Sequence, residues 1–137
     1  MSNLNESVKD ISRVTVMWVA SAINTLFGGA DGIFLTLIVF MSVDYITGVC
    51  AAIVNRQVSS RIGAKGLAKK MGILCVVVLA TLIEKNVIDT TALRTAVILY
   101  YISNEGISIF ENITRMGVPV PKKMKELLSQ LTDENPQ

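Results

Sequence analysis

The sequence predicts an all-α integral membrane protein with a single domain. Of its 137 residues, 51% are apolar and only 18% are charged, which is too apolar a balance for an ordinary soluble domain of this length. The apolar residues form long stretches, and the basic residues gather in short clusters beside them. Because about 20 apolar helical residues cross a hydrocarbon core of roughly 30 Å, these stretches predict transmembrane helices. We expect three of them, or four if the first helix also crosses.

The first predicted element is a helix over residues 12–27. This segment is apolar, and its polar residues gather toward one side at helical spacing: Ser21, Asn24 and Thr25, with Gly28 after them. Such a helix either lies in the membrane interface or crosses the bilayer. The preceding residues lack the basic opening and cleavage site of a secretory signal, so the apolar segments are expected to be retained.

Two predicted spans follow, over residues 33–54 and 67–83. Asp44 is the only charged residue in the first of them. The second is short, and Lys69 and Lys70 stand near its start. We interpret this lysine pair as interface anchors whose side chains reach toward the headgroups. Direct contact with anionic lipid headgroups is the alternative.

The third predicted span covers residues 91–110 and is the most polar. Its polar residues recur at helical spacing and continue beyond the span, which predicts one broad polar face made of Asn104, Glu105, Ser108, Glu111 and Asn112. Such a face is unfavourable against lipid and requires protein partners. In the alternative interpretation, the span ends near Ile102 and the rest is a solvated helix.

A cytoplasmic tail is predicted over residues 114–137. After a turn at Pro119 and Pro121, residues 122–131 have the apolar spacing of a short amphipathic helix. Basic residues are concentrated in this tail and in the connection at 55–70. By the positive-inside rule, both segments face the cytoplasm.

Asp44 is the most informative residue of the first span. A charged side chain at membrane depth costs roughly 2.5 to 3.5 kcal/mol on insertion, so Asp44 needs a partner or water. Thr47 lies one turn further, and Gly48 and Ala52 form a small-residue pair that lets helices approach closely. We interpret this group as an oligomer seam, and an intramolecular packing role as the alternative. At 1.5 Å per residue, Asp44 and Glu105 reach depths within roughly 5 Å of each other, so they are expected to be neighbours.

Enzyme chemistry has no support in the sequence. The chain contains no His, and Cys50 and Cys75 both lie in apolar stretches, where a thiol usually behaves as a small buried hydrophobe. We find no phosphate-binding glycine loop, no nucleophile with a paired base and no metal-ligand motif. A net charge of +2 is too small for a nucleic-acid binder. We therefore expect no catalytic activity, no cofactor, no metal and no nucleic-acid partner.

The chain resembles the toxin-secretion and phage-lysis holin family. The resemblance rests on residues 101–112 (YISNEGISIFEN), 117–121 (GVPVP) and 127–131 (LLSQL), and on residues 44–48 (DYITG) followed by Ser59, Ser60, Gly63, Gly66 and Lys69. It implies a multi-pass protein of the bacterial cytoplasmic membrane. It also implies that copies of the chain assemble into a lesion that releases a cytoplasmic endolysin or, in some members, a large toxin.

Two other functions compete with this one. Carboxylates inside a membrane also suit a small selective ion channel or transporter. A membrane scaffold is the third candidate, in which the basic tail from Lys122 onward recruits a soluble partner.

Overall fold

The computed structural model describes residues 2–88 and 92–133. Over these residues all of the regular secondary structure is helical, with five helices and no strand. They are α1 (Ser2–Phe27), α2 (Gly32–Val54), α3 (Ser60–Asn86), α4 (Leu93–Arg115) and α5 (Lys122–Asp133). The all-α prediction is confirmed.

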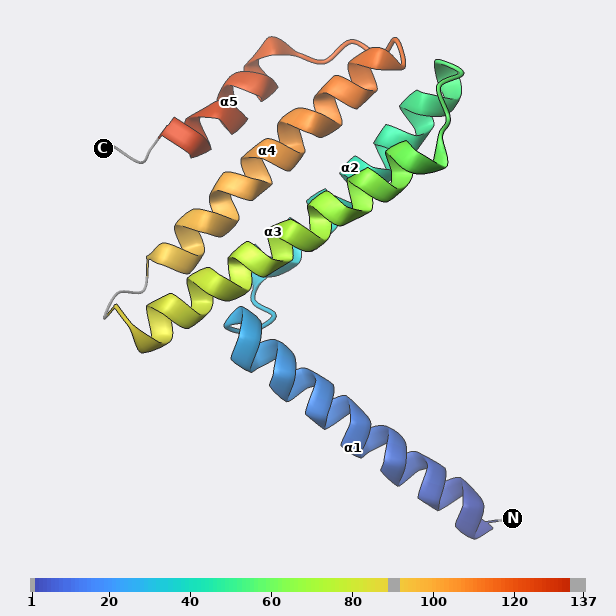
Figure 1. Cartoon of the computed structure of the whole chain (residues 1–137), viewed down its shortest axis with the longest axis vertical. Helices are drawn as coiled ribbons and strands as arrows, with labels where there is room; N and C mark the ends of the chain where they lie inside the picture. The colour runs from blue at the N-terminus through green and yellow to red at the C-terminus, as the bar shows by residue number, and fades with distance from the viewer. Residues whose placement is uncertain (1, 89–91, 134–137) are drawn as a thin grey trace.

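A bundle of α2, α3 and α4 forms the body of the molecule, and α5 folds back along α4 (Figure 1). The three long helices run side by side, whereas α1 projects away from one end of the bundle. Helix α4 contacts α2, α3 and α5, and it has more buried residues than any other helix. The most polar of the long bundle helices is therefore the one most enclosed by protein.

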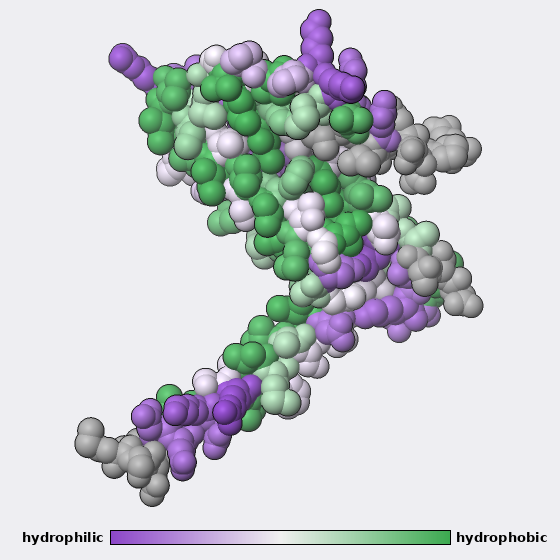
Figure 2. Space-filling view, turned by 180° about the vertical axis from the view of Figure 1, so that it is seen from behind, coloured by the Kyte–Doolittle hydropathy of each residue, from purple (hydrophilic) through white to green (hydrophobic). Residues whose placement is uncertain are grey.

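The apolar core lies in the half of the bundle nearer α1. It joins Phe34, Leu37 and Met41 of α2 to Ile73 and Val77 of α3 and to Ile98 and Ile102 of α4. Many apolar side chains also cover the outside of the bundle, as the face in Figure 2 shows. An outer surface this apolar is suited to lipid rather than to water.

Two helices are long and apolar enough to cross a membrane, judged by length and composition within the described residues. They are α2 and α3, with mean hydropathies of 2.1 and 2.0 over their most apolar windows. Neither α1 nor α4 meets the same criterion. The third and fourth spans therefore stay predictions, although the enclosure of α4 supplies the protein partners that its polar face requires.

The helices extend beyond their predicted limits. Helix α1 begins at Ser2 rather than near residue 12, because residues 2–11 contain no Gly or Pro to interrupt it. Helix α3 begins at Ser60, about two turns before the predicted span, and α4 continues to Arg115. The predicted start of the third span at Thr91 and the end of the predicted tail, residues 134–137, lie outside the described residues.

Candidate functional site

An ion triad connects the three bundle helices. The ammonium of Lys70 on α3 lies 2.7 Å from the Asp44 carboxylate of α2 and also pairs with the Glu105 carboxylate of α4. Glu105 has no exposed surface and Lys70 is 8% exposed. Asp44 and Glu105 are thus neighbours, as their equal depth predicts, and Lys70 lies between them.

Asn112 extends the triad toward the end of α4. Its side-chain amide donates to the Asp44 carboxylate at 3.1 Å and to the Thr47 hydroxyl at 3.3 Å. Gly48 lies beside this contact, where a Cβ would meet the Asn112 amide nitrogen at 3.5 Å, an ordinary van der Waals distance. The polar residues of α2 and α4 therefore bind each other inside one chain.

The triad holds more acid than base. Two carboxylates share one ammonium, so full ionisation leaves a net charge of −1 in a buried site. Among the described residues, Oε1 of Glu105 is the one buried side-chain polar atom without a hydrogen-bond partner. A buried ion pair is weak support for stability, because desolvation of its charges opposes their attraction. Such a group of charges suits a site that specifies one packing of the three helices and that can change its charge partners.

The structure separates the predicted polar face into two groups. Glu105, Ser108 and Asn112 face α2 and α3 and lie in or beside the triad. Glu111 is exposed on another side of α4, and Asn104 is half-buried. Ala52 lines a groove that also reaches Asp44 and Gly48. The role of these residues in contacts between copies stays a prediction.

The two lysines at the start of the second span have different surroundings. Lys69 is exposed, as an interface anchor requires. Lys70 differs from the prediction, because its ammonium turns inward to the two carboxylates. Inside the bundle this ammonium compensates two buried carboxylates, which would be left as uncompensated charge without it, whereas a salt bridge at the wet surface contributes only about 0 to 1 kcal/mol.

A second buried cation, Arg94, fixes the connection between α1 and α2. Its guanidinium donates to the Asp31 carboxylate at 2.7 and 3.1 Å and to the carbonyls of Phe27 and Gly29. This contact holds the pKa of Asp31 below its ordinary value. Gly28 has a φ of +76°, and a Cβ there would lie 2.7 Å from Nε of Arg94. Sequence reasoning missed this site, although an arginine beside an apolar segment was a signal for it.

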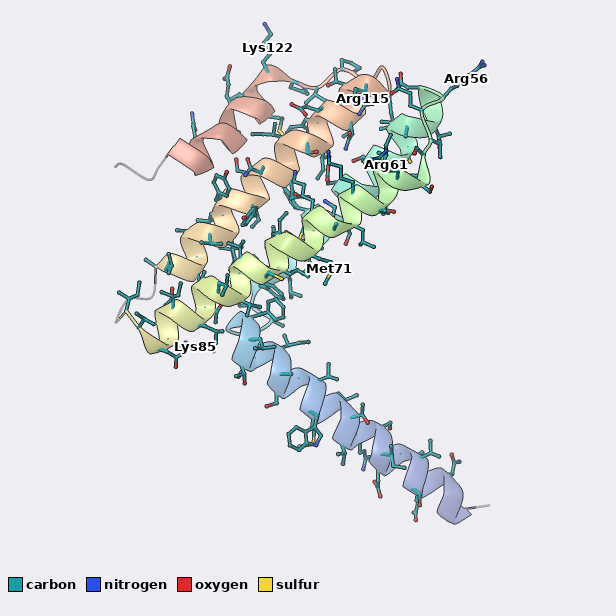
Figure 3. All side chains as sticks on the ribbon, viewed as in Figure 1. Arg56, Arg61, Met71, Lys85, Arg115 and Lys122 are labelled. Atoms are coloured by element: carbon teal, nitrogen blue, oxygen red, sulfur yellow. The ribbon has the colours of Figure 1, made fainter. Side chains whose placement is uncertain are left out.

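Basic side chains gather at the opposite end of the bundle. Arg56, Arg61, Arg115 and Lys122 lie at this end, whereas Lys85 lies at the end near α1 (Figure 3). The Asn55 side chain donates to the backbone carbonyl of Arg115 at 3.2 Å, which joins the α2–α3 loop to the end of α4. The loop and the start of the tail thus share one end. The side of a membrane that this end faces stays a prediction.

Comparisons with known proteins agree with the resemblance found in the sequence. The sequence profile of the bacteriophage holin family matches residues 21–133. A probable holin of Bacillus phage phi105 is 34% identical over 113 residues, which cover 82% of each chain. An uncharacterised 14.9 kDa protein of Clostridium perfringens is 38% identical, over 87% of this chain and 94% of its own.

An uncharacterised protein of Listeria monocytogenes is 42% identical over 103 residues, which cover 75% of this chain and 74% of its own. No solved structure matches the fold. The family profile covers most of the chain, and it includes all three members of the triad. Membership of this family implies a location in the cytoplasmic membrane, and the two apolar helices α2 and α3 are compatible with it. The chain belongs to the bacteriophage holin family.

Proposed function

We propose that this chain is a holin that self-associates in the cytoplasmic membrane and opens a lesion through which an endolysin leaves the cell. Family membership and the apolar outer surface of the bundle support this function. The observation that carries it is the buried triad of Asp44, Lys70 and Glu105. A single chain in lipid turns these charges inward, and a lesion offers them water.

The triad gives the closed chain and the lesion different energies. In lipid, an exposed charge is costly, so pairing inside the bundle favours the closed chain. At the rim of a water-filled lesion the same charges are solvated, and an ion pair in water contributes only about 0 to 1 kcal/mol. Assembly that admits water therefore shifts the population toward a state in which α4 turns its polar face to the lumen.

Contacts between copies are proposed along the same surfaces. Thr47, Gly48 and Ala52 lie on the side of α2 that is poor in bulky residues, and Asn112 packs there within one chain. Opening exchanges that internal contact for one with a neighbouring copy. The lesion is then lined by α4, the helix whose inward face holds Glu105, Ser108 and Asn112.

Lysis timing in bacteria tests this function. The chain is expressed with and without a co-expressed endolysin, and abrupt lysis is expected only when both are present. A variant that removes all three charges (Asp44→Asn, Lys70→Met and Glu105→Gln) is expected to insert and accumulate but to lyse late or not at all, because it has no charge to expose. Lysis on the parental schedule would contradict the proposal. Membrane fractionation with immunodetection establishes that both proteins accumulate equally.

Passage of a large solute through the membrane distinguishes a lesion from a selective pore. Cells that lose ions but retain the endolysin would indicate a channel and would overturn the proposed release of a folded enzyme.

A further inference from the structure

A groove opens beside the triad, between α2 and α3 at the basic end of the bundle. Its volume is about 320 Å³. Polar residues of the α2–α3 loop and of α4 line it, and Asp44 and Lys70 lie among its lining residues. Gly48, Gly63 and Gly66 line it as well and leave room where larger side chains would fill it.

The charge of this groove favours an anion. Lys69, Lys70 and Arg115 line it together with the carboxylate of Asp44, and Lys70 is also paired with Glu105, so these ionised groups together have a net charge of +1. Lys70 is already paired with carboxylates, which leaves Lys69 and Arg115 as the exposed cations. The amino-terminal end of α3 borders the groove at Ser59, and a helix terminus of this kind also favours negative charge.

The apolar part of the lining distinguishes a lipid from a free ion. Val49, Val58 and Ile62 line the groove beside its polar residues, and all of them are exposed on the outside of the bundle. A ligand with a phosphate at one end and hydrocarbon at the other can satisfy both parts at once. Inorganic phosphate has no hydrocarbon part that could pack against the apolar residues.

The depth of the groove also suits a headgroup. Helix α3 has 27 residues and is about 40 Å long at 1.5 Å per residue, which exceeds a hydrocarbon core of roughly 30 Å. Its amino-terminal part, residues 60–70, carries a run of basic residues that includes Arg61, Lys65 and Lys69. This part is therefore expected in the headgroup layer, where the groove opens.

We propose that the groove between α2 and α3 binds the phosphodiester headgroup of an anionic phospholipid, held by Lys69 and Arg115, with the acyl chains along the exposed apolar faces of both helices. The inference goes beyond lesion formation and does not depend on it. Basic pockets between membrane helices are known sites of this chemistry. A bound lipid would occupy the groove next to the triad and would stabilise the closed bundle, because binding to the native state adds to its stability.

Lipid titration of the purified full-length chain tests the site. The protein in neutral detergent is titrated with phosphatidylglycerol and, separately, with phosphatidylcholine, and bound lipid is followed by native mass spectrometry. Removing a basic residue weakens binding to an anionic headgroup by about five-fold. The double variant Lys69→Gln with Arg115→Gln is compared with a matched control, Arg56→Gln with Arg61→Gln, which removes the same charge at the same end outside the groove. The groove variant is expected to bind phosphatidylglycerol at least about ten-fold more weakly than the control.

A steric variant checks the same site without a change of charge. The Cβ of a residue at Gly66 would lie 3.8 Å from the Tyr45 ring, an ordinary contact, so Gly66→Leu can fill the groove while the helix is retained. It is expected to reduce phosphatidylglycerol binding to the level of the groove variant.

Two results would overturn the inference. Equal losses in the groove variant and its control would indicate diffuse attraction of the basic end for anionic lipid. Displacement of phosphatidylglycerol by an equal concentration of inorganic phosphate would identify a site for the free ion. Both readouts measure binding, so they are independent of whether the chain lyses cells.

Discussion

Removal of the central ammonium by Lys70→Met should destabilise the bundle strongly. Methionine has nearly the same helix propensity as lysine and a similar length, so the substitution mainly removes charge. The lysine side chain is 10% exposed, and its two carboxylate partners are 13% and 1% exposed, so solvent screens the pairs weakly. Breaking a buried pair from one side costs about 3 to 5 kcal/mol, because it leaves uncompensated charge. Here two carboxylates would face each other.

The assay is chemical unfolding of the purified chain in detergent, followed by circular dichroism. Lys65→Met is the matched control, because Lys65 is an exposed lysine of the same helix. The expected loss for Lys70→Met is about 3 to 5 kcal/mol, against less than about 0.5 kcal/mol for the control.

A rescue variant strengthens the test. When Asp44→Asn and Glu105→Gln are added to Lys70→Met, no charge remains unpaired, so most of the stability should return. If Lys70→Met unfolds at the same denaturant concentration as Lys65→Met, or if the added substitutions give no rescue, the triad does not hold the bundle together.

Further predictions concern the Arg94 site at the other end of the bundle. Arg94→Gln should speed amide exchange between α1 and α2 and cost about 1 to 3 kcal/mol, because the partly buried carbonyls of Phe27 and Gly29 lose their donor. Arg13→Gln, on exposed α1, should change neither the exchange nor the stability. Because the pKa of Asp31 is lowered in the folded chain, its contribution to stability is complete above the ordinary value of 3.8 and is lost as pH falls through the folded value. When unfolding is measured as a function of pH, this acid loss of stability should be absent in Arg94→Gln. Gly28→Ala should lower stability by about 1 to 3 kcal/mol, because the φ of Gly28 is positive and the new Cβ meets Arg94. Gly32→Ala is the control and should not lower stability, because there is open space around Gly32. Equal unfolding of these last two variants would contradict the close packing at Gly28.

Helical rise explains why part of the site follows from the sequence. Depth along a helix depends only on residue count, so Asp44 and Glu105 were expected at one level, and the structure places them on the same ammonium. The helical fold and the amphipathic helix after Pro121 follow from apolar spacing in the same way.

The direction in which a side chain points around the helix axis is harder to predict than its depth along that axis. Lys69 and Lys70 are about 100° apart on α3, and only the positions of α2 and α4 decide which of them turns inward. The same holds for Glu111, which is exposed, and Asn112, which is buried next to it. Arg94 was missed because its partners lie in a turn more than 60 residues earlier, and long-range pairing of this kind leaves no local pattern.

Release of a folded enzyme from vesicles tests the central claim most directly. The purified chain is reconstituted into phosphatidylcholine and phosphatidylglycerol vesicles that contain both a small fluorescent dye and a folded enzyme of endolysin size. The account predicts that the parent chain releases dye and enzyme together, and that the variant without the triad charges releases neither on the same time scale. Release of dye or ions while the enzyme stays inside would contradict a lesion, and equal release by both proteins would contradict a role for Asp44, Lys70 and Glu105 in opening it.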